Sequence, residues 1–255
     1  MPDAMAVTCS SPSVCGAIHA APEAHALYEP RIAEIAAEQF RERQNARPVP
    51  VKPLFYRAIK RAIDVAVSSL AIAVFFVPGA LLSVVIMRDT GGSPFYLQTR
   101  VGKGGRLFKI VKFRTMVADS DNLRQHFTEQ QMRDWVYEHK VERDPRITKL
   151  GAFLRRTSID EIPNFINAFL GQMSIVGPRA VTPEELVWYG EDVDLLLSVP
   201  AGITGMWQVE SRNEARYQTG ERQALELDYV RNACLGLDVK IFFQTFAVIV
   251  SKTGS

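Results

Sequence analysis

A run of 23 residues without a charged side chain, Val65 to Met87, constrains this chain more than any other feature. At about 1.5 Å per residue, a helix of that length just crosses the roughly 30 Å hydrocarbon core of a bilayer. Pro78 and Gly79 lie near its middle, where proline removes a backbone donor and glycine loosens a helix. The run therefore predicts a membrane helix, either a single span or a helix with a break at Pro78.

Basic residues flank this run on both sides. They are Arg57, Lys60 and Arg61 before it, and Arg88, Arg100, Lys103 and Arg106 after it. A spanning helix usually has its Lys/Arg excess on one side only. Basic flanks on both sides favour a re-entrant helix that enters the membrane, turns at Pro78 and returns to the same face. Hydropathy alone leaves open a bitopic protein with residues 1–60 outside the cell.

The rest of the composition indicates the cellular environment in which the chain works. The three cysteines, Cys9, Cys15 and Cys234, are too sparse for a disulfide scaffold or a cysteine zinc site, so we expect a reducing, cytoplasmic environment. Met1 to Ala26 has no basic start and no long apolar stretch, so no signal peptide is expected. A net charge of +2 excludes neither a membrane nor a nucleic-acid partner.

The pattern divides the chain into three parts and predicts an α+β fold that is mostly helical. Residues 1–50 form an N-terminal appendage, partly disordered, with a short helix over 30–44. Residues 51–90 hold a basic approach helix and the membrane helix, and residues 91–255 a small cytoplasmic domain. In that domain we expect a short β-hairpin of strands 94–98 and 107–113, helices over 121–139, 157–170, 182–197 and 219–230, and an interfacial C-terminal helix over 238–251.

The neighbouring acids Asp160 and Glu161 have two interpretations that fit their spacing equally. Ser158 and Glu161 match a capping box, with Ser158 as the N-cap of a helix that begins there. Alternatively, the pair is a reaction centre next to Arg155 and Arg156. In that case basic neighbours and the helix dipole would keep Asp160 ionised, so that it could act as a nucleophile or metal ligand.

A basic stripe without any acidic residue follows the membrane helix. Its members are Arg100, Lys103, Arg106, Lys109, Lys112 and Arg114. Such a run is usually a solvated face, but directly after a membrane segment its natural partners are phosphates and anionic head groups. Strand alternation places Lys112 and Arg114 on the same side.

Three further segments carry weaker signals. The turn Gly177-Pro178-Arg179 could present an arginine fork to phosphate oxygens. The glycine-containing loop 200–208 fits either a nucleotide cradle or a tight connection. Asp228 is either a charge on a helix face or a partner in a metal site.

Together these segments resemble the bacterial sugar transferase family, the monotopic polyprenyl-phosphate phosphoglycosyl transferases. The resemblance covers about residues 55–255 and rests on motifs in a fixed order. They are Lys60-Arg61-x-x-Asp64, Gln98-x-Arg100-x-Gly102, Lys112-Phe-Arg-Thr-Met116, Asp144-Pro-Arg-Ile-Thr148, Leu154-Arg-Arg-Thr-Ser-Ile-Asp-Glu-Ile-Pro163, Met173-Ser-Ile-Val-Gly-Pro-Arg179 and Gly202-Ile-Thr-Gly-Met-Trp-Gln208. The chain looks most like members that start exopolysaccharide synthesis with galactose or glucose.

The resemblance implies a re-entrant helix-break-helix and a reaction at the inner membrane of a bacterium, on its cytoplasmic face. Hexose 1-phosphate would pass from a UDP-sugar to polyprenyl phosphate with release of UMP. Asp160 matches the family's nucleophile, which carries an aspartyl-phosphosugar intermediate, and Glu161 matches the residue that holds Mg²⁺. Lys112, Arg114, Arg155 and Arg179 are the expected phosphate-binding residues, with Asp228 and Arg212 as further site candidates.

The resemblance has limits. Asn164, Ala180 and Glu210-Ser211 depart from the family pattern, and the last departure precedes Arg212 in a loop expected to recognise the substrate. The sugar, a homo-oligomeric state and the role of residues 1–50 stay open. No nucleic-acid partner is expected. The alternative function is a membrane scaffold of the same fold that has lost catalysis.

Overall fold

The computed structural model describes residues 52–138, 141, 143–210 and 220–252. The predicted appendage at residues 1–50, with its helix over 30–44, lies outside this range. The helix that precedes the body is α3 (Leu54–Thr90). It is followed by β1 (Phe95–Val101), η1 (Lys103–Gly105), β2 (Leu107–Phe113), α4 (Leu123–His126), α5 (Glu129–Glu138), α6 (Lys149–Thr157), η2 (Ile159–Glu161), α7 (Asn164–Phe169), β3 (Ser174–Val176), η3 (Glu184–Asp192), α8 (Val193–Leu196), β4 (Gly202–Thr204), α9 (Met206–Glu210), α10 (Glu221–Asn232) and α11 (Leu235–Lys252).

The predicted α+β class with a short hairpin is confirmed. β1 and β2 pair antiparallel, with Tyr96 opposite Lys112 and Arg100 opposite Phe108. A second, parallel pair of three-residue strands, β3 and β4, was not predicted, because so short a buried strand has no readable alternation. The predicted helix over 182–197 is a 3₁₀ helix followed by α8, and α4 with α5 replaces the single helix over 121–139.

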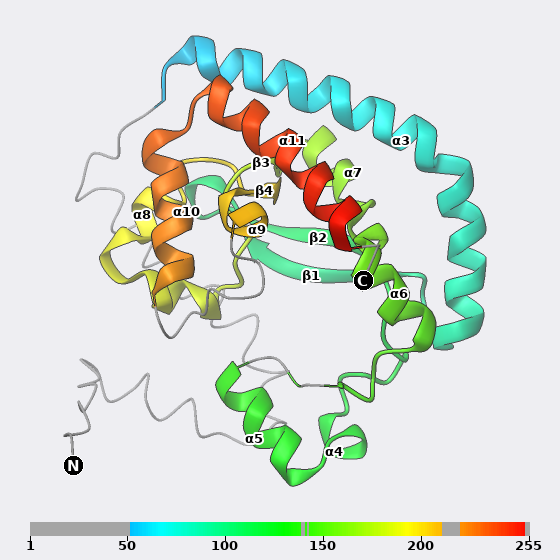
Figure 1. Ribbon diagram of the computed structural model, residues 1–255. Coiled ribbons are helices and arrows are strands. Elements are labelled where there is room, and N and C mark those ends of the chain that lie inside the picture. Colours follow the sequence, from blue (N-terminus) through cyan, green and yellow to red (C-terminus); the bar gives the residue numbers. More distant parts are fainter. Residues whose placement is uncertain (1–51, 139–140, 142, 211–219, 253–255) are drawn as a thin grey trace, which may run out of the picture.

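α3 is one helix of 37 residues that contains Pro78 in its interior. Figure 1 shows it running along one edge of the body and then bending around it. Proline provides no N–H for the helical ladder and its ring crowds the preceding turn, which is the physical cause of such a bend. The expected break at Pro78 is therefore a bend within a continuous helix and does not divide it into two.

The outer face of α3 is apolar and exposed. Its large exposed side chains include Leu70, Val74, Phe75, Phe76, Val77, Leu81, Val84, Val85 and Met87. By length and composition α3 could cross a membrane, and only 6% of its most apolar window is buried in the body. An apolar surface of this extent is typical of a membrane or protein contact.

The part of α3 before Pro78 is bonded to the body through charged side chains. The buried carboxylate of Asp64 accepts hydrogen bonds from Ser174 Oγ at 3.0 Å and from the Ile175 N–H at 2.9 Å. Arg61 donates to the carbonyls of the last two residues of α7, at 2.6 and 2.7 Å. Lys60 pairs with Asp238 of α11 at 2.8 Å. These bonds set the start of α3 against β3, α7 and α11.

The part of α3 after Pro78 packs on the same body. Ile86 is fully buried in a small cluster with Phe113 of β2 and Leu154 of α6. Both ends of the apolar helix therefore contact one folded unit, which holds the acidic pair.

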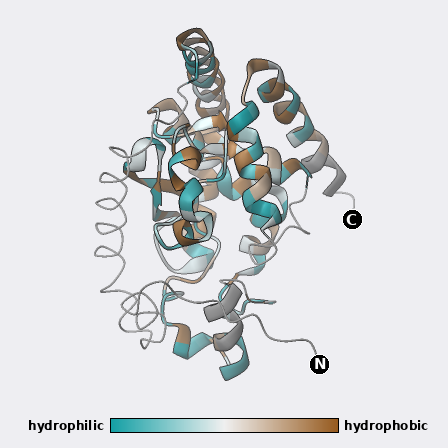
Figure 2. Ribbon diagram, turned by 90° about the vertical axis from the view of Figure 1, so that its left-hand side faces the viewer, coloured by the Kyte–Doolittle hydropathy of each residue, from teal (hydrophilic) through white to brown (hydrophobic). Residues whose placement is uncertain are grey.

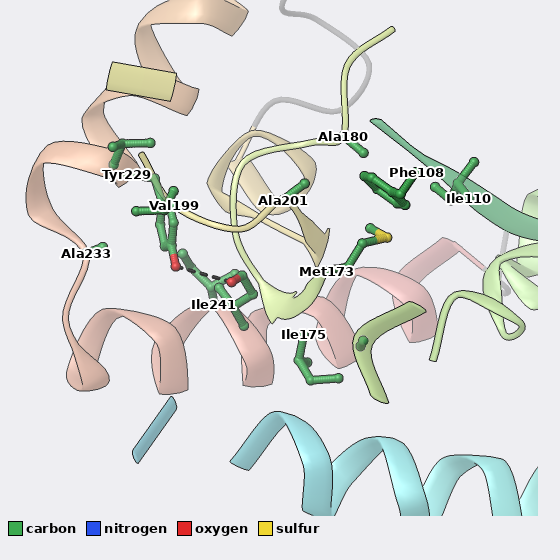
Figure 3. Close-up of a cluster of buried hydrophobic side chains, with 13 residues drawn as sticks. Phe108, Ile110, Met173, Ile175, Ala180, Val199, Ala201, Tyr229, Ala233 and Ile241 are labelled. Atoms are coloured by element: carbon green, nitrogen blue, oxygen red, sulfur yellow. Dashed lines mark hydrogen bonds between the residues drawn. The ribbon is translucent and has the colours of Figure 1, made fainter. Parts of the chain in front are cut away.

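The main core lies where β3, β4, α10 and α11 meet. Figure 3 shows Val199 and Ile241 close to Tyr229, Met173 beside Phe108, and Ile175 on the side toward α3. The Tyr229 hydroxyl is hydrogen-bonded both to the Val176 carbonyl, at 3.3 Å, and to Asp238, at 2.6 Å. Brown and teal segments alternate along the helices of the body in Figure 2, the pattern of amphipathic elements that cover a shared core.

The arm formed by α4 and α5 lies on the far side of the hairpin from α3 (Figure 1). Arg146 connects it to the body: its guanidinium lies 4.4 Å from the Phe127 ring centroid and 4.5 Å from that of Trp135. Asp144 binds the same guanidinium at 2.6 and 2.9 Å. The motif Asp144-Pro-Arg146 thus packs this arm against the body.

The helix that ends before the acidic pair depends on a glycine. A Cβ at Gly151 would collide with the carbonyl oxygen and Cα of Thr115, so α6 can approach the strand end only without a side chain there. We expect Gly151→Ala to lower the free energy of unfolding by about 1–3 kcal/mol, although alanine normally favours a helix. Thermal unfolding in detergent measures it. Gly236→Ala in α11, where a Cβ meets nothing within 4 Å, is the control and should be neutral or stabilising; an equal loss in both would contradict the packing argument.

Candidate active site

The acidic pair lies in a short 3₁₀ turn between two helices. Thr148 caps α6 by accepting the Gly151 N–H at 2.8 Å, and the helix ends at Thr157. Ser158 then adopts a left-handed conformation with φ of 57° and terminates α6, because its N–H bonds back to the Leu154 and Arg155 carbonyls. η2 follows and contains Asp160 and Glu161.

The predicted capping box is therefore wrong. Ser158 is the C-cap of the preceding helix, and its side chain makes no capping hydrogen bond to η2. The predicted helix over 157–170 is replaced by η2 and α7. A sequence pattern of Ser-x-x-Glu does not distinguish these cases, since both place serine at a helix boundary.

Glu161 forms an ion pair with a lysine on the hairpin. Lys112 Nζ lies 2.8 Å from Glu161 Oε1, and both side chains are about one-quarter exposed, at 26% and 28%. Asn167 of α7 fixes the strand beside it: its Oδ1 accepts the Val111 N–H at 3.0 Å and its Nδ2 donates to the Lys109 carbonyl at 2.8 Å. The amide thus occupies the edge of β2 as another strand would, and sets Lys112 against the acidic turn.

Asp160 is largely withdrawn from solvent and lies between charges of both signs. Burial raises the pKa of Asp160 to about 6, and the neighbouring Glu161 carboxylate raises it as well. Lys112 and Arg155 act in the opposite direction. The expected effect of a helix dipole is not found, because a three-residue turn has no helix of sufficient length behind it. At neutral pH Asp160 is mostly ionised, yet more basic than an ordinary aspartate.

Arg155 is the second cation beside the pair. Its Nε donates to Thr115 Oγ1 at 2.8 Å, which orients the guanidinium from the end of α6. Burial lowers the pKa of Arg155, while Asp160 and Asp144 counteract that shift. Arg114 lies elsewhere: its Nε donates to the Ser93 carbonyl at 2.8 Å. Of the two hairpin cations expected together, only Lys112 forms an ion pair with the acidic pair in the structure.

Arg179 belongs to a second cluster of charges at the other end of the hairpin. Its guanidinium pairs with Glu185 at 3.1 Å, and Glu185 also pairs with Arg100 of β1 at 3.0 Å. Arg100 faces Phe108 in the strand register, four positions along β2 from Lys112. At about 3.3 Å per residue the two clusters are separated by about 13 Å along the strand.

The remaining predicted site residues are Asp228 and Arg212. Asp228 accepts a hydrogen bond from Asn232, one turn later in α10, at 2.8 Å. This contact fits a charge on a helix face, one of the two alternatives left open for Asp228. Arg212 lies outside the described residues. Within the part of the chain that the structure describes, no group of three or more His, Cys, Asp or Glu side chains could hold a metal ion.

Three polar residues of these clusters were not singled out from the sequence: Asn167, Glu185 and Glu226. Glu226 is 1% exposed and accepts the Arg179 N–H at 2.8 Å. Its signal is a charged residue on the buried stripe of α10, between Gln223 and Val230. Asn167 and Glu185 occur in segments whose periodicity gives no such indication.

Comparison with known proteins shows the family to which this chain belongs. The model of the family described as bacterial sugar transferase matches residues 55–252. The UDP-galactose-lipid carrier transferase of Erwinia amylovora is 39% identical over 202 residues, which cover 78% of this chain and 42% of the relative. The exopolysaccharide production protein ExoY of Rhizobium meliloti is 37% identical over 199 residues, 77% of this chain and 87% of the relative.

A third relative is the undecaprenyl-phosphate galactose phosphotransferase of Salmonella typhimurium, 37% identical over 202 residues that cover 78% of this chain and 42% of the relative. The chain thus spans less than half the length of several curated relatives that it matches, including an uncharacterized sugar transferase of Haemophilus influenzae. The shared part is the one that contains α3, the hairpin and the acidic pair. With a family model that covers nearly the whole described structure, the chain belongs to the bacterial sugar transferase family.

Proposed function

We propose that this protein transfers hexose 1-phosphate, from UDP-galactose or UDP-glucose, to polyprenyl (undecaprenyl) phosphate and releases UMP, as the first membrane step of exopolysaccharide or O-antigen assembly. The observation that carries the proposal is the Asp160–Glu161 pair beside Lys112 and Arg155, on a body that holds both ends of a membrane-length helix. Support comes from relatives whose names specify UDP-galactose, UDP-glucose or undecaprenyl phosphate.

Asp160 is the proposed nucleophile. A carboxylate oxygen of Asp160 forms a bond to the phosphorus that bears the sugar, and the bond from that phosphorus to the UMP oxygen breaks, with the electron pair leaving on UMP. An oxygen of polyprenyl phosphate then attacks the same phosphorus and displaces the Asp160 carboxylate. The raised pKa of Asp160, about 6, gives an oxygen that is ionised at neutral pH and more basic than usual.

Fixed cations are needed because both substrates and the nucleophile are anions. Lys112 and Arg155 approach from β2 and α6, and each is oriented by a further contact, Lys112 by Glu161 and Arg155 by Thr115. They stabilise negative charge that accumulates on the transferred phosphoryl group. Arg179, in the second cluster, is proposed to bind a phosphate of the nucleotide sugar farther from the reacting carboxylate.

The acidic pair also fits Mg²⁺. Magnesium in phosphoryl-transfer sites is usually held by one or two carboxylates together with substrate phosphates. The adjacent carboxylates of Asp160 and Glu161 in η2 supply that set. Glu161 would hold the ion, with Asp160 next to it. Bound there, Mg²⁺ would offset the charge of the substrate phosphates.

For α3 we propose a re-entrant course, with the protein monotopic on the cytoplasmic face of the inner membrane. A spanning helix carries its two ends to opposite sides of the bilayer. Here Asp64 before Pro78 is bonded to Ser174 and Ile175, while Ile86 after Pro78 is buried against Phe113 and Leu154 of the same body. One body that contacts both arms, together with the bend of α3, supports entry and exit on one side.

Replacing Asp160 tests the nucleophile. Asp160→Asn should lower the rate of UMP release from UDP-galactose or UDP-glucose by at least about three orders of magnitude, because the amide cannot form the covalent bond. A coupled assay for UMP with the full chain in lipid nanodiscs and Mg²⁺ measures it. Asp228→Asn, at a half-buried position of α10 where the side chain bonds Asn232, is the matched control. An unchanged rate in Asp160→Asn refutes the assignment, and no UMP release by the wild type across a panel of UDP-sugars favours the inactive scaffold.

Lys112 should determine the pH at which the rate of donor cleavage rises. Asp160 reacts as the carboxylate, so the rate of donor cleavage rises with pH through the pKa of Asp160 and levels off above it. Lys112 lowers that pKa, so Lys112→Gln should move the ascending limb to higher pH as well as lower its plateau. Single-turnover rates at fixed Mg²⁺ give both profiles. Lys109→Gln, exposed on the same strand, should leave the limb in place; a limb unmoved in Lys112→Gln contradicts the electrostatic role.

Cysteine labelling tests the topology of α3. Single cysteines introduced by Lys52→Cys and Ser93→Cys, in a chain without its native cysteines, flank the helix on its two sides. A re-entrant course predicts that a membrane-impermeant maleimide labels neither in intact cells and both after permeabilisation. A cysteine in a periplasmic marker protein controls for access of the reagent. Labelling of only one of the two sites in intact cells would establish a span.

A further inference from the structure

Charged side chains fasten the segment that carries Arg179 almost residue by residue. Four successive residues each have a backbone group bonded to a neighbouring element. The bonds are Arg179 N–H to Glu226 Oε2 at 2.8 Å, Arg100 Nη1 to the Ala180 carbonyl at 3.0 Å, Val101 N–H to the Val181 carbonyl at 2.9 Å and Thr182 N–H to Glu185 Oε2 at 2.7 Å. The preceding Pro178 carbonyl accepts the Gly202 N–H at 2.7 Å. A turn held this closely leaves its side chains, and above all Arg179, in a fixed direction.

Glu185 holds the guanidinium of Arg179. Its Oε1 accepts Arg179 Nη1 at 3.1 Å, while its Oε2 accepts Arg100 Nη1 at 3.0 Å and the Thr182 N–H. The guanidinium groups of Arg179 and Arg100 lower the pKa of Glu185 to about 2, although its burial acts to raise it. Arg179 remains 30% exposed at its side chain, whereas Arg100 is buried at 8%. Arg179 is therefore the arginine of this pair with a face toward solvent.

Glu226 holds the backbone of Arg179 from α10. It is 1% exposed, its Oε2 accepts the Arg179 N–H, and its Oε1 is buried without a hydrogen-bond partner in the described part of the chain. Burial raises the pKa of Glu226 to about 7. Burying a carboxylate is costly, and an uncharged acceptor could bond the same N–H at lower cost. The carboxylate is therefore not explained by its burial, whereas its bond to the Arg179 N–H gives it a role in placing Arg179.

We propose that Glu185 and Glu226 are positioning residues for Arg179: Glu226 fixes its backbone, Glu185 fixes its guanidinium, and together they aim it at a phosphate of the nucleotide sugar. The inference rests on the proposed function, which supplies that ligand. Among the described residues, the three arginines Arg100, Arg179 and Arg222 lie near Glu185 or Glu226. A phosphate at the exposed face of Arg179 would accept hydrogen bonds from its guanidinium.

The test compares two substitutions of Glu226. Glu226→Gln keeps an acceptor oxygen for the Arg179 N–H, whereas Glu226→Met keeps the length of the side chain and removes the acceptor. We expect Glu226→Met to raise the KM for the UDP-sugar about tenfold with kcat changed less than about twofold, and Glu226→Gln to restore most of the affinity. Glu185→Gln should raise the KM similarly, and it remains informative if Glu226→Met does not fold. Glu221→Gln, exposed in the first turn of α10, is the control.

A double-mutant cycle separates positioning from general stability. In an Arg179→Ala background, Glu226→Met and Glu185→Gln should add no further rise in KM, because the residue that they place is gone. The same rise in both backgrounds, or a Glu226→Gln variant as impaired as Glu226→Met, overturns the inference. Thermal unfolding of each variant identifies losses caused by misfolding. If the wild type releases UMP from no UDP-sugar, the proposed function fails; if it does and the cycle is additive, only the positioning role fails.

Discussion

Two adjacent carboxylates can remain partly buried in one turn only if cations are fixed beside them, and much of the body serves that constraint. Lys112 reaches Glu161 from β2, and Arg155 approaches Asp160 from the end of α6. Neither cation is held by its own charge pair alone. Asn167 binds the edge of β2 at Lys109 and Val111, directly before Lys112, and Thr115 orients Arg155. Charge repulsion within the pair is therefore balanced by residues from β2, α6, α7 and the segment that follows β2.

The elements on both sides of this turn contact the apolar helix α3 directly. Arg61 of α3 caps the C-terminus of α7, the helix directly after η2, and Asp64 is bonded to the strand after that. Beyond Pro78, Ile86 packs on Leu154, one turn before the end of α6. The elements on both sides of the acidic pair are thus fastened to opposite arms of one bent helix. For the proposed transfer from a soluble nucleotide sugar to a lipid phosphate, this arrangement would hold the acidic pair at a constant distance from the apolar surface of α3.

Much of this was predictable because it depends on local signals. The uncharged run and its proline predicted α3 and a disturbance at Pro78, and the alternation of residues around a glycine turn predicted the hairpin with the right strands. The acidic pair and Lys112 were identified from the ordered motifs. The errors occur where one pattern has two structural solutions. Ser-x-x-Glu fits a helix start and also a helix end followed by a 3₁₀ turn, and only the packing of α6 on Thr115 and the left-handed Ser158 select the second.

The sequence by itself determined the class of chain, the membrane-length helix and the acidic pair with its basic neighbours, since these depend on composition, periodicity and motif order. The tertiary structure decided which charges meet. It separated Arg114 and Arg179 from the acidic pair, set Lys112 against Glu161, and brought Glu226 from α10 to the turn at Arg179, a pairing across 47 residues of sequence. Such partners follow from chain crossings that no local pattern encodes. Electrostatic balance in a buried site is a property of the assembled elements.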